Sequence, residues 1–301
     1  MNIQQHPLSI DDRIINETQL IFHGEGSNSR VWCDRHTAYK IPKIEIRDRS
    51  FALVLRDAFF QNIVDNYHTK LCFGRWMFNN NVPIMVNQTL SPCSIAPPIH
   101  TGGVGILIYD LVHQLYRINQ YGIRHGDIHP HNICLDNTEE HFKLIDFDNA
   151  ADITTTMLKH IKLPTICAPE VFNTEGITNS SEVWSLGLTV AMMCKGSIIK
   201  PTTQRACERI INEAEKGTLR DFLKDTLNID PQKRLDIDTL AGKYSSKILH
   251  HHPPIPNRQV DWFEISQAIR VLIEGVFCDN CSLNSMIVCV EEAKTIRKML
   301  L

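Results

Sequence analysis

The chain has 301 residues, of which 43% are hydrophobic and 22% charged, and its formal net charge is −3 at pH 7. This length and composition suit a folded protein of about two domains. The near-neutral charge gives no general reason to expect nucleic acid or an anionic membrane as a partner. No apolar run approaches the roughly 18 residues that span a bilayer, and the N-terminus lacks the features of a signal peptide. We therefore expect a cytosolic or nuclear location.

Ten cysteines are scattered along the chain. In a reducing compartment we expect them to be free and mostly buried thiols. A zinc site is the alternative at the close pair Cys278 and Cys281, with Cys289 and the run 250–252 of histidines as further ligands. Their spacing fits no common zinc pattern, which favours free thiols.

The N-terminal third alternates between strand and turn signals. Residues 1–17 are expected to be a polar lead. Alternating apolar, aromatic and β-branched residues over 18–43 predict three strands separated by turns. An apolar stripe at helical spacing predicts a helix over 48–66, and 72–90 has the pattern of two further strands around a polar turn. We therefore expect a small strand-rich lobe over 18–90.

Three prolines and two glycines interrupt regular structure over 91–103. Helices dominate the pattern after this break, and they are expected at 104–121, 181–195, 203–215, 218–226 and 236–247. We therefore expect a larger, mainly helical lobe over 91–250 and a helical extension over 251–301. The predicted fold class is α+β, with an antiparallel-sheet lobe before a helical lobe. A cleft between two such lobes is a natural place for a ligand.

The stretch "HGEGSNSRV" places Gly24 and Gly26 between two predicted strands. Glycines at such a turn let backbone N–H groups approach phosphate oxygens without a Cβ in the way. Most turns of this kind are only hairpins, however. Lys40 follows in a later strand of the same predicted sheet, where a lone lysine is usually a solvent-exposed side chain. These residues indicate phosphate binding only if the rest of the chain supports it.

The stretch "HGDIHPHN", residues 125–132, holds three histidines, Asp127 and Asn132, and "LIDFDNA" places Asp146 after an apolar pair, as at a strand end. A histidine metal site, a proton-transfer site and a merely histidine-rich loop are all compatible with the first stretch. Carboxylate and amide oxygens suit Mg²⁺, which would fit Asn132 and Asp146. Asp127 is then placed to accept a proton from an attacking hydroxyl.

The order of these features, a Gly-rich turn, a lysine, D-x4-N and D-F, resembles the protein-kinase-like phosphotransferases. The resemblance implies ATP and Mg²⁺ as cofactors, Asp127 as the catalytic base, and Asn132 and Asp146 as metal ligands. Lys40 would contact the α- and β-phosphates and so counts among the catalytic residues. The implied ATP-binding residues are Gly24, Glu25, Gly26, Ser27, Asn28, Ser29, Val31, Lys40 and Asp57.

Two branches of that superfamily compete. The loop at 125–132 is itself more similar to aminoglycoside and choline-type small-molecule kinases. Downstream, "CAPEVF" with Glu170, "SSEVWSLG" with Trp184 and "NIDPQKRL" with Arg234 resemble protein kinases, and we expect Arg234 to pair with Glu170. The motifs span 18–248, and together they favour a serine/threonine protein kinase. A catalytically weak pseudokinase scaffold and a small-molecule kinase are the alternatives.

Helix C is the first departure from the family pattern. No glutamate occurs between Glu45 and Glu139 to pair with the strand lysine. Asp57, 17 residues after Lys40 on the predicted helix, is the best substitute, and Asp65 is the second. Asp57 as an ordinary solvent-exposed helix residue is the competing interpretation. Aspartate is one methylene shorter than glutamate, so the helix must lie closer to the lysine or the pair is looser.

Other departures fall in the loops. Gly126 stands where an arginine usually contacts a phosphorylated activation loop, so the resemblance implies activity without that phosphorylation. The threonines at 154–156 and 165 are candidate phosphorylation sites, although the sequence favours ordinary loop threonines there. Asp148 replaces a glycine, and either stiffens the loop or approaches a second metal. His129 replaces a lysine that contacts the transferred phosphate, and we assign it that role. We expect His125 to anchor the loop to the core and His131 to be exposed.

The drifted motifs are also similar to those of virus-encoded kinases, including those of herpesviruses. That resemblance would place the protein in a host cell. We expect ATP and protein substrates as partners, and a further partner could bind through the extension at 251–301.

Overall fold

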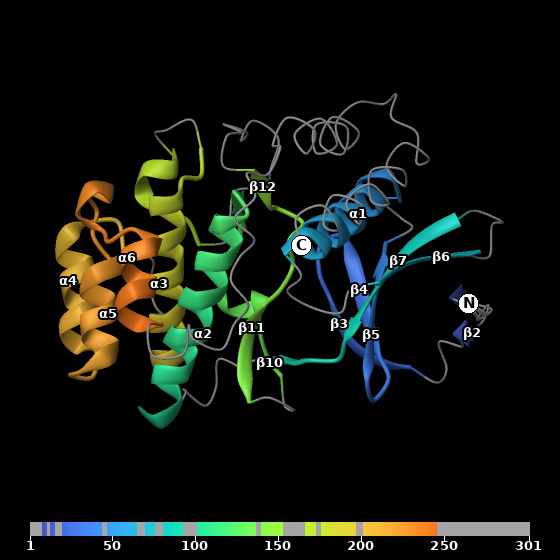
Figure 1. Cartoon of the computed structure of the whole chain (residues 1–301), viewed down its shortest axis with the longest axis horizontal. Coiled ribbons are helices and arrows are strands. Elements are labelled where there is room, and N and C mark those ends of the chain that lie inside the picture. The colour runs from blue at the N-terminus through green and yellow to red at the C-terminus, as the bar shows by residue number, and fades with distance from the viewer. Residues whose placement is uncertain are drawn as a thin grey trace. The chain divides into compact units, whose positions relative to one another are not determined.

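The structure is a computed structural model, and it describes residues 8–10, 13–15, 20–43, 47–64, 70–75, 81–92, 101–136, 140–152, 166–172, 176–196 and 201–245. These residues divide into two compact units, the first up to Leu90 and the second from Ser91 onward. The first is a sheet with one long helix and the second is mainly helical (Figure 1). The predicted α+β fold class is confirmed.

Unit 1 contains a five-stranded antiparallel sheet in the order β3-β4-β5-β7-β6 (Figure 1). Its strands are β3 (Ile21–Glu25), β4 (Ser29–Cys33), β5 (Thr37–Pro42), β6 (Lys70–Arg75) and β7 (Asn81–Gln88). Asp34 closes the turn between β4 and β5, because its carboxylate accepts hydrogen bonds from the N–H groups of His36 and Thr37. The three strands predicted over 18–43 and the two over 72–90 are confirmed.

The first residues differ from the expected polar lead. Strands β1 (Leu8–Ile10) and β2 (Arg13–Ile15) pair as an antiparallel hairpin. Each strand has only three residues, which is too short for the alternation of side chains to stand out in the sequence. The hairpin is therefore a correction that sequence periodicity alone could not supply.

Helix α1 (Arg47–Val64) packs against β5 and β7. Among the residues of its apolar stripe whose burial the structure describes, Val54 and Ala58 are nearly inaccessible. Three polar residues of the same helix are buried as well, namely Arg56, Asp57 and Gln61. A buried polar group is costly unless it is hydrogen-bonded or paired, so α1 carries more than a packing function.

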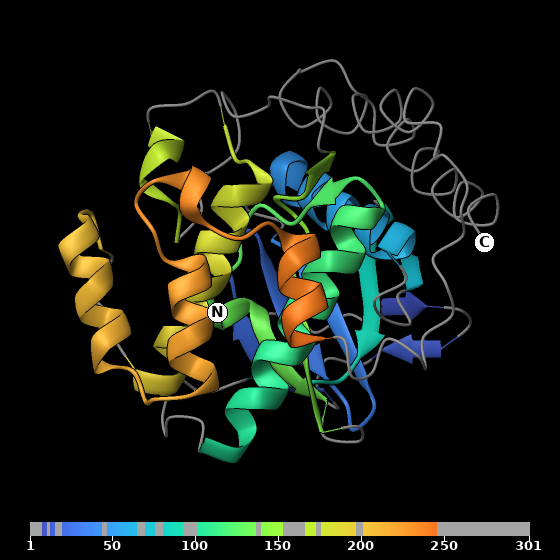
Figure 2. The same ribbon diagram turned by 60° about the vertical axis from the view of Figure 1, so that its left-hand side comes forward.

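Unit 2 is built around α2 (Thr101–Gln120), which packs against α3, α5 and α6 (Figures 1 and 2). The other helices are α3 (Asn179–Lys195), α4 (Gln204–Glu213), α5 (Thr218–Thr226) and α6 (Ile237–Tyr244). All five match predicted segments within a few residues. A capping box of Thr178 and Ser181 begins α3. Gly187 lets α3 approach α5, since a Cβ there would lie 2.2 Å from the Thr226 hydroxyl.

Short strands and 3₁₀ turns frame the loops of unit 2. Strand β8 pairs with β10, β10 with β11, and β9 with β12. The strands are β8 (Ser91–Pro92), β9 (Ile123–Arg124), β10 (Ile133–Asp136), β11 (His141–Leu144) and β12 (Ala151–Asp152), and the 3₁₀ turns are Pro130–Asn132, Pro169–Phe172 and Pro231–Lys233.

Side chains of α2 complete the outer edge of β11. The Asp110 carboxylate accepts a hydrogen bond from the Phe142 N–H at 2.8 Å and lies 2.8 Å from His141 Nδ1. Gln114 donates to the Phe142 carbonyl and accepts from the Leu144 N–H. Edge strands leave backbone groups without strand partners, and these bonds supply them. The strand that leads to Asp146 is thereby fixed to the core helix.

Among the cysteines whose side chains the structure describes, Cys33, Cys134, Cys167, Cys194 and Cys207 are free thiols, and all but Cys194 are buried. The expectation of free, mostly buried thiols is confirmed for these five. Among the helices that the structure describes, none is both long and apolar enough to cross a membrane.

Candidate active site

The Gly-rich turn joins β3 to β4 in unit 1. The Gly26 N–H donates to the Ser29 carbonyl at 2.9 Å, which closes the turn, and the Lys43 N–H donates to Asn28 O at 2.9 Å. The Glu25 carboxylate pairs with Lys43 and lies 3.7 Å from Arg30. The turn is therefore held at its base by its own backbone and by charged side chains.

Among the described residues, neither a positive φ nor close packing requires glycine at the two glycine positions of this turn. Neither Gly24 nor Gly26 has a positive φ. A Cβ at Gly24 would meet nothing within 4 Å, and one at Gly26 would lie an ordinary 3.8 Å from Ser29 O. Glycine without a conformational or packing reason in a protein fold points to space kept open beside the backbone. The turn fits a ligand that approaches the main chain closely, as a phosphate does.

Lys40 lies on β5, directly opposite Val31 of β4. Its Nζ forms an ion pair of 2.6 Å with Asp57 Oδ2 of α1. The Asp57 side chain is only 1% exposed and that of Lys40 14%. Asp57 is thus a buried partner of the strand lysine and not a solvent-exposed helix residue. The shorter side chain is accommodated because α1 packs directly on β5.

Gln61 supports this ion pair, and sequence inspection did not identify it. Its Nε2 donates to Asp57 Oδ1 at 3.0 Å, so both carboxylate oxygens of Asp57 are held. Gln61 is one helical turn after Asp57, on the same face of α1. A buried glutamine at that spacing is the signal that could have found it, but burial is not visible in the sequence.

His125, at the start of the loop of residues 125–132, is an anchor in the core of unit 2. It is fully buried, and its ring lies 4.7 Å from that of Phe147. Its Nε2 donates to the Ile145 carbonyl at 3.1 Å, and Nδ1 accepts from the Asp127 N–H. Burial lowers the pKa of His125 to about 4, so the ring is neutral at pH 7. Both nitrogens are engaged, which confirms the predicted anchor.

The other two histidines of the loop differ in their exposure to solvent. His131 is exposed, as predicted. His129 is buried, and its Nδ1 accepts a hydrogen bond from the His131 N–H. In a neutral ring the proton then sits on Nε2, which lies 3.5 Å from Asp127 Oδ2. Among the residues that the structure describes, no group of three His, Cys, Asp or Glu side chains is placed to hold a metal.

Asp127 and Asn132 are connected through the loop backbone. Asn132 Nδ2 donates to the Asp127 carbonyl at 2.9 Å, and the Asn132 carbonyl accepts from the Ile145 N–H at 2.9 Å. With its Nδ2 committed, the Asn132 side chain has Oδ1 as the atom that can face a cation. Asp127 Oδ2 also accepts from the Nδ2 of Asn149, a residue that the sequence motifs did not single out, at 3.3 Å.

Asp146 follows β11 in a left-handed backbone conformation, with φ of 69°. This region is uncommon for a residue with a side chain, and such outliers cluster at functional sites. The hydrogen bond from the Ile145 N–H to the Asn132 carbonyl joins the backbone next to Asp146 to Asn132. Both candidate metal ligands are thus held by one local network. Two oxygen donors of this kind fit Mg²⁺. Their role as metal ligands stays a prediction.

Glu182 of α3 supports the backbone of the loop of residues 125–132. Its Oε1 accepts from the Gly126 N–H at 2.8 Å. Complete burial raises the pKa of Glu182 to about 7. Two residues after Gly126, the Ile128 carbonyl accepts a hydrogen bond from the Thr189 hydroxyl of the same helix. Helix α3 thus fixes the loop backbone at two points.

The predicted pair of Arg234 and Glu170 is present and bidentate, with Nη1–Oε1 at 2.5 Å and Nη2–Oε2 at 2.9 Å. The guanidinium also donates to the carbonyls of residues 180, 228 and 229, which accounts for all five of its N–H groups. It lies 5.0 Å from the centre of the Trp184 ring. This cluster joins the motif of Glu170 to α3 and to the 3₁₀ turn at Pro231–Lys233, as the protein-kinase resemblance implied.

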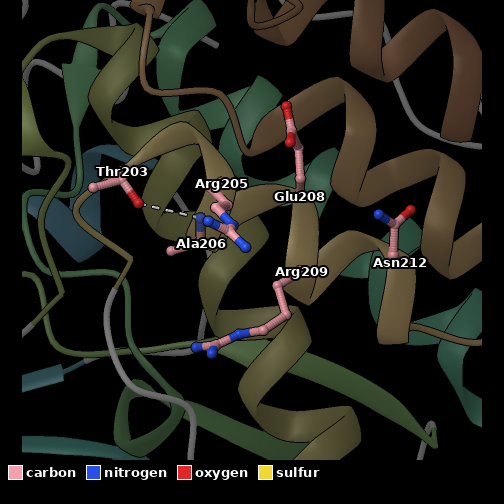
Figure 3. A pocket seen from close by; sticks show the side chains of 6 residues that line it. All are labelled: Thr203, Arg205, Ala206, Glu208, Arg209 and Asn212. Carbon is pink, nitrogen blue, oxygen red and sulfur yellow. Dashed lines mark hydrogen bonds between the residues drawn. The ribbon is translucent and has the colours of Figure 1, made fainter.

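A separate hollow of about 570 Å³ lies on α4 and is lined by Thr203, Arg205, Ala206, Glu208, Arg209 and Asn212 (Figure 3). It contains none of the predicted site residues. Its arginines and Glu208 are exposed, and the Thr203 hydroxyl is used to cap the helix. The hollow is therefore distinct from the candidate active site.

Several expectations fall outside the described residues. These are the alternative helix partner Asp65, the threonines at 154–156 and 165, the zinc alternative at Cys278 and Cys281, and the helical extension at 251–301. They stay predictions.

The chain matches the family model of the protein kinase domain over residues 98–251. It is 26% identical over 227 residues to serine/threonine-protein kinase MST20 of Pyricularia oryzae, covering 70% of this chain and 24% of the relative. It is 27% identical over 229 residues to serine/threonine-protein kinase STE20 of Candida glabrata, covering 71% and 24%. Serine/threonine-protein kinase KIC1 of Saccharomyces cerevisiae is 29% identical over 168 residues, covering 51% and 15%.

The fold and the Glu170–Arg234 pair match the pattern of the protein-kinase-like class. The chain belongs to the protein kinase family, since the family model covers half of it. It spans about a quarter or less of the length of the relatives above. Members of this family transfer the γ-phosphate of ATP to protein hydroxyls.

Proposed function

We propose that this chain is an active serine/threonine protein kinase that transfers the γ-phosphate of ATP to a serine or threonine hydroxyl of a protein. The bidentate Glu170–Arg234 pair carries the choice of a protein substrate over a small molecule, because small-molecule kinases lack that motif set. The named relatives of this chain are serine/threonine protein kinases as well.

Lys40 contributes a cation for the α- and β-phosphates, and the ion pair with Asp57 positions the Lys40 amine. The backbone at the tip of the Gly-rich turn, around Ser27 and Asn28, covers the phosphates, while Gly26 keeps its own N–H on Ser29. Positioning and charge neutralisation of this kind supply most of the catalysis in phosphoryl transfer.

Asp127 orients the substrate hydroxyl and takes its proton as the oxygen attacks the γ-phosphorus. The new O–P bond forms while the bond to the β-phosphate oxygen breaks and ADP leaves. Asn132 and Asp146 hold magnesium through oxygen atoms, and the ion, when bound, neutralises phosphate charge. His129 directs its Nε2 toward the Asp127 carboxylate, and we retain its contact with the transferred phosphate as a proposal.

The pseudokinase alternative is not favoured. Lys40, Asp127, Asn132 and Asp146 are all retained, and the missing helix-C glutamate is replaced by an aspartate at 2.6 Å from the lysine amine. Helix α1 therefore keeps an ion pair to Lys40, and loss of that ion pair would have favoured an inactive scaffold.

The test is a transfer assay with radiolabelled ATP, Mg²⁺ and a degenerate peptide library whose members carry a single Ser, Thr or Tyr. We expect label on Ser and Thr peptides with the wild type, and background label with Lys40→Met and with Asp127→Asn. Matched controls are Lys224→Met and Asp221→Asn, which alter an exposed pair on α5 and should leave transfer unchanged.

Background transfer by the wild type and both site variants would contradict enzymatic activity. A parallel assay on choline and an aminoglycoside separates the small-molecule alternative. Label on these compounds, with none on peptides, would show that the loop at 125–132 and not the downstream motifs indicates the substrate.

A further inference from the structure

Asn149 lies against the catalytic loop although no motif of the family pattern led us to it. It is 8% exposed, and its Nδ2 donates to Asp127 Oδ2 at 3.3 Å. His129 Nε2 lies 3.5 Å from the same oxygen. Two side chains therefore converge on one oxygen of the residue that we propose as the base.

The strand register places Asn149 there. Strands β9 and β12 pair antiparallel, with Ala151 opposite Arg124 and Asp152 opposite Ile123. Continuing this register by two residues puts Asn149 opposite Gly126. A turn closed by the Ala150 N–H on the Phe147 carbonyl, at 3.1 Å, brings the chain to that position. The pairing of β9 with β12 and this turn thus bring Asn149 beside Gly126.

Gly126 makes the close approach possible. A Cβ at this position would lie 2.4 Å from Asn149 O and 3.3 Å from Asn149 Cβ. The backbone of Gly126 also has φ of 83°, which side chains rarely adopt. Any side chain at this position would displace the Asn149 backbone and, with it, the amide that reaches Asp127. The contact of Asn149 with Asp127 therefore depends on glycine, in place of the usual arginine, at position 126.

We propose that Asn149 is a positioning residue that fixes the Asp127 carboxylate for proton abstraction, and that Gly126 is required for this contact. The inference rests on the proposed kinase activity. A carboxylate attached through single bonds rotates about χ1 and χ2, and each wrong rotamer turns the base away from the hydroxyl. A donor held by the β9–β12 register restricts that rotation, and supporting contacts of this kind preorganise catalytic groups.

The main variant is Asn149→Leu, which keeps a similar side-chain volume and removes the donor. We expect kcat for peptide phosphorylation to fall about 10- to 100-fold, the loss typical of a small misplacement of a reacting group, with KM for ATP within about twofold of the wild type. Asn149→Asp should lose at least as much, because it replaces the donor with a second negative charge. Asn212→Leu and Asn212→Asp, on an exposed position of α4, are the matched controls and should match the wild type.

Gly126→Ala distinguishes positioning of Asp127 from a general structural effect. It should lower kcat at least as much as Asn149→Leu, and adding Asn149→Leu to it should cost less than about twofold more, because both changes remove the same contact. Fully additive losses, or a wild-type kcat in Asn149→Leu, would overturn the role of Asn149 while leaving the kinase activity intact. A wild-type chain that labels no more peptide than Asp127→Asn would overturn the proposed function itself, and the role of Asn149 with it.

Discussion

Two buried ion pairs, one in each unit, show how the same interaction serves different ends. In unit 2 the Arg234 side chain is 0% exposed, and all five of its N–H groups are used within the protein. In unit 1 the Lys40 amine is held at 2.6 Å by Asp57, and the lysine side chain is 14% exposed. A guanidinium group whose N–H groups all donate within the protein has none left for a ligand, so the Arg234–Glu170 pair is structural. In the Lys40–Asp57 pair the lysine is partly exposed to solvent, which suits the binding of an anion.

Arg234→Ala should have the largest effect on stability. Removing one partner of a buried, saturated pair leaves Glu170 and three carbonyls without their donors, at a cost of about 3–5 kcal/mol. Because a chain of two units need not unfold in one step, hydrogen exchange of the α3 amides is the suitable measure of unit 2. Lys233→Ala, at the neighbouring exposed residue, is the control. A loss below about 1 kcal/mol would show that the cluster is dispensable.

Glu182 is a buried carboxyl group that accepts a hydrogen bond from the backbone N–H of Gly126. Its pKa is raised to about 7 by burial, so the folded state binds the proton more tightly than the unfolded state, whose pKa is near 4.5. The stability from this group is full below about pH 4.5 and is lost as the pH rises through 7, a change on the order of 3 kcal/mol.

Glu182→Gln keeps an acceptor for Gly126 and should remove this pH dependence. The difference in unfolding free energy between the variant and the wild type, followed by hydrogen exchange of α3, should therefore grow in favour of the variant between pH 5 and 8. Glu208→Gln, at an exposed position of α4, should follow the wild type. Parallel curves for Glu182→Gln and the wild type would mean that Glu182 titrates normally.

Asp57 tests the functional pair. Asp57→Ala should lower kcat/KM for ATP about 10- to 100-fold, since Lys40 loses the group that positions it. Asp57→Glu restores the family residue, yet we expect it to remain impaired, because a pair already at 2.6 Å has no room for an extra methylene. Steady-state kinetics with varied ATP measures both, with Asp221→Ala as the exposed control. Full activity of Asp57→Glu would show that α1 adjusts freely.

The smallest effect belongs to an exposed pair. Lys195 and Glu213 lie 3.2 Å apart with side chains 27% and 60% exposed. Solvent and salt screen such pairs, so Lys195→Ala should change the unfolding free energy by less than about 0.5 kcal/mol. Hydrogen exchange of the α3 amides checks this. A larger loss would mean that burial is not what separates strong from weak pairs in this protein.

The sequence predicted the elements well where they are long. The helix over 48–66, those of the second unit and the strands over 18–43 all follow from apolar periodicity, which is a local property. The hairpin of β1 and β2 escaped prediction because three-residue strands carry no period. The buried polar residues Arg56 and Gln61 escaped as well, because a helix pattern shows which face is apolar but not which polar groups have partners inside.

The sequence by itself determined the family, because the order and spacing of glycines, lysine, D-x4-N, D-F and the downstream motifs are one-dimensional features that chance rarely reproduces. It also indicated that Asp57 would replace the missing glutamate. Only the tertiary structure decided how the site residues are held. The Gln61 contact to Asp57 depends on helix packing, and that of Asn149 to Asp127 depends on the pairing of β9 with β12. Such contacts join residues through backbone geometry, and no spacing along the chain encodes them.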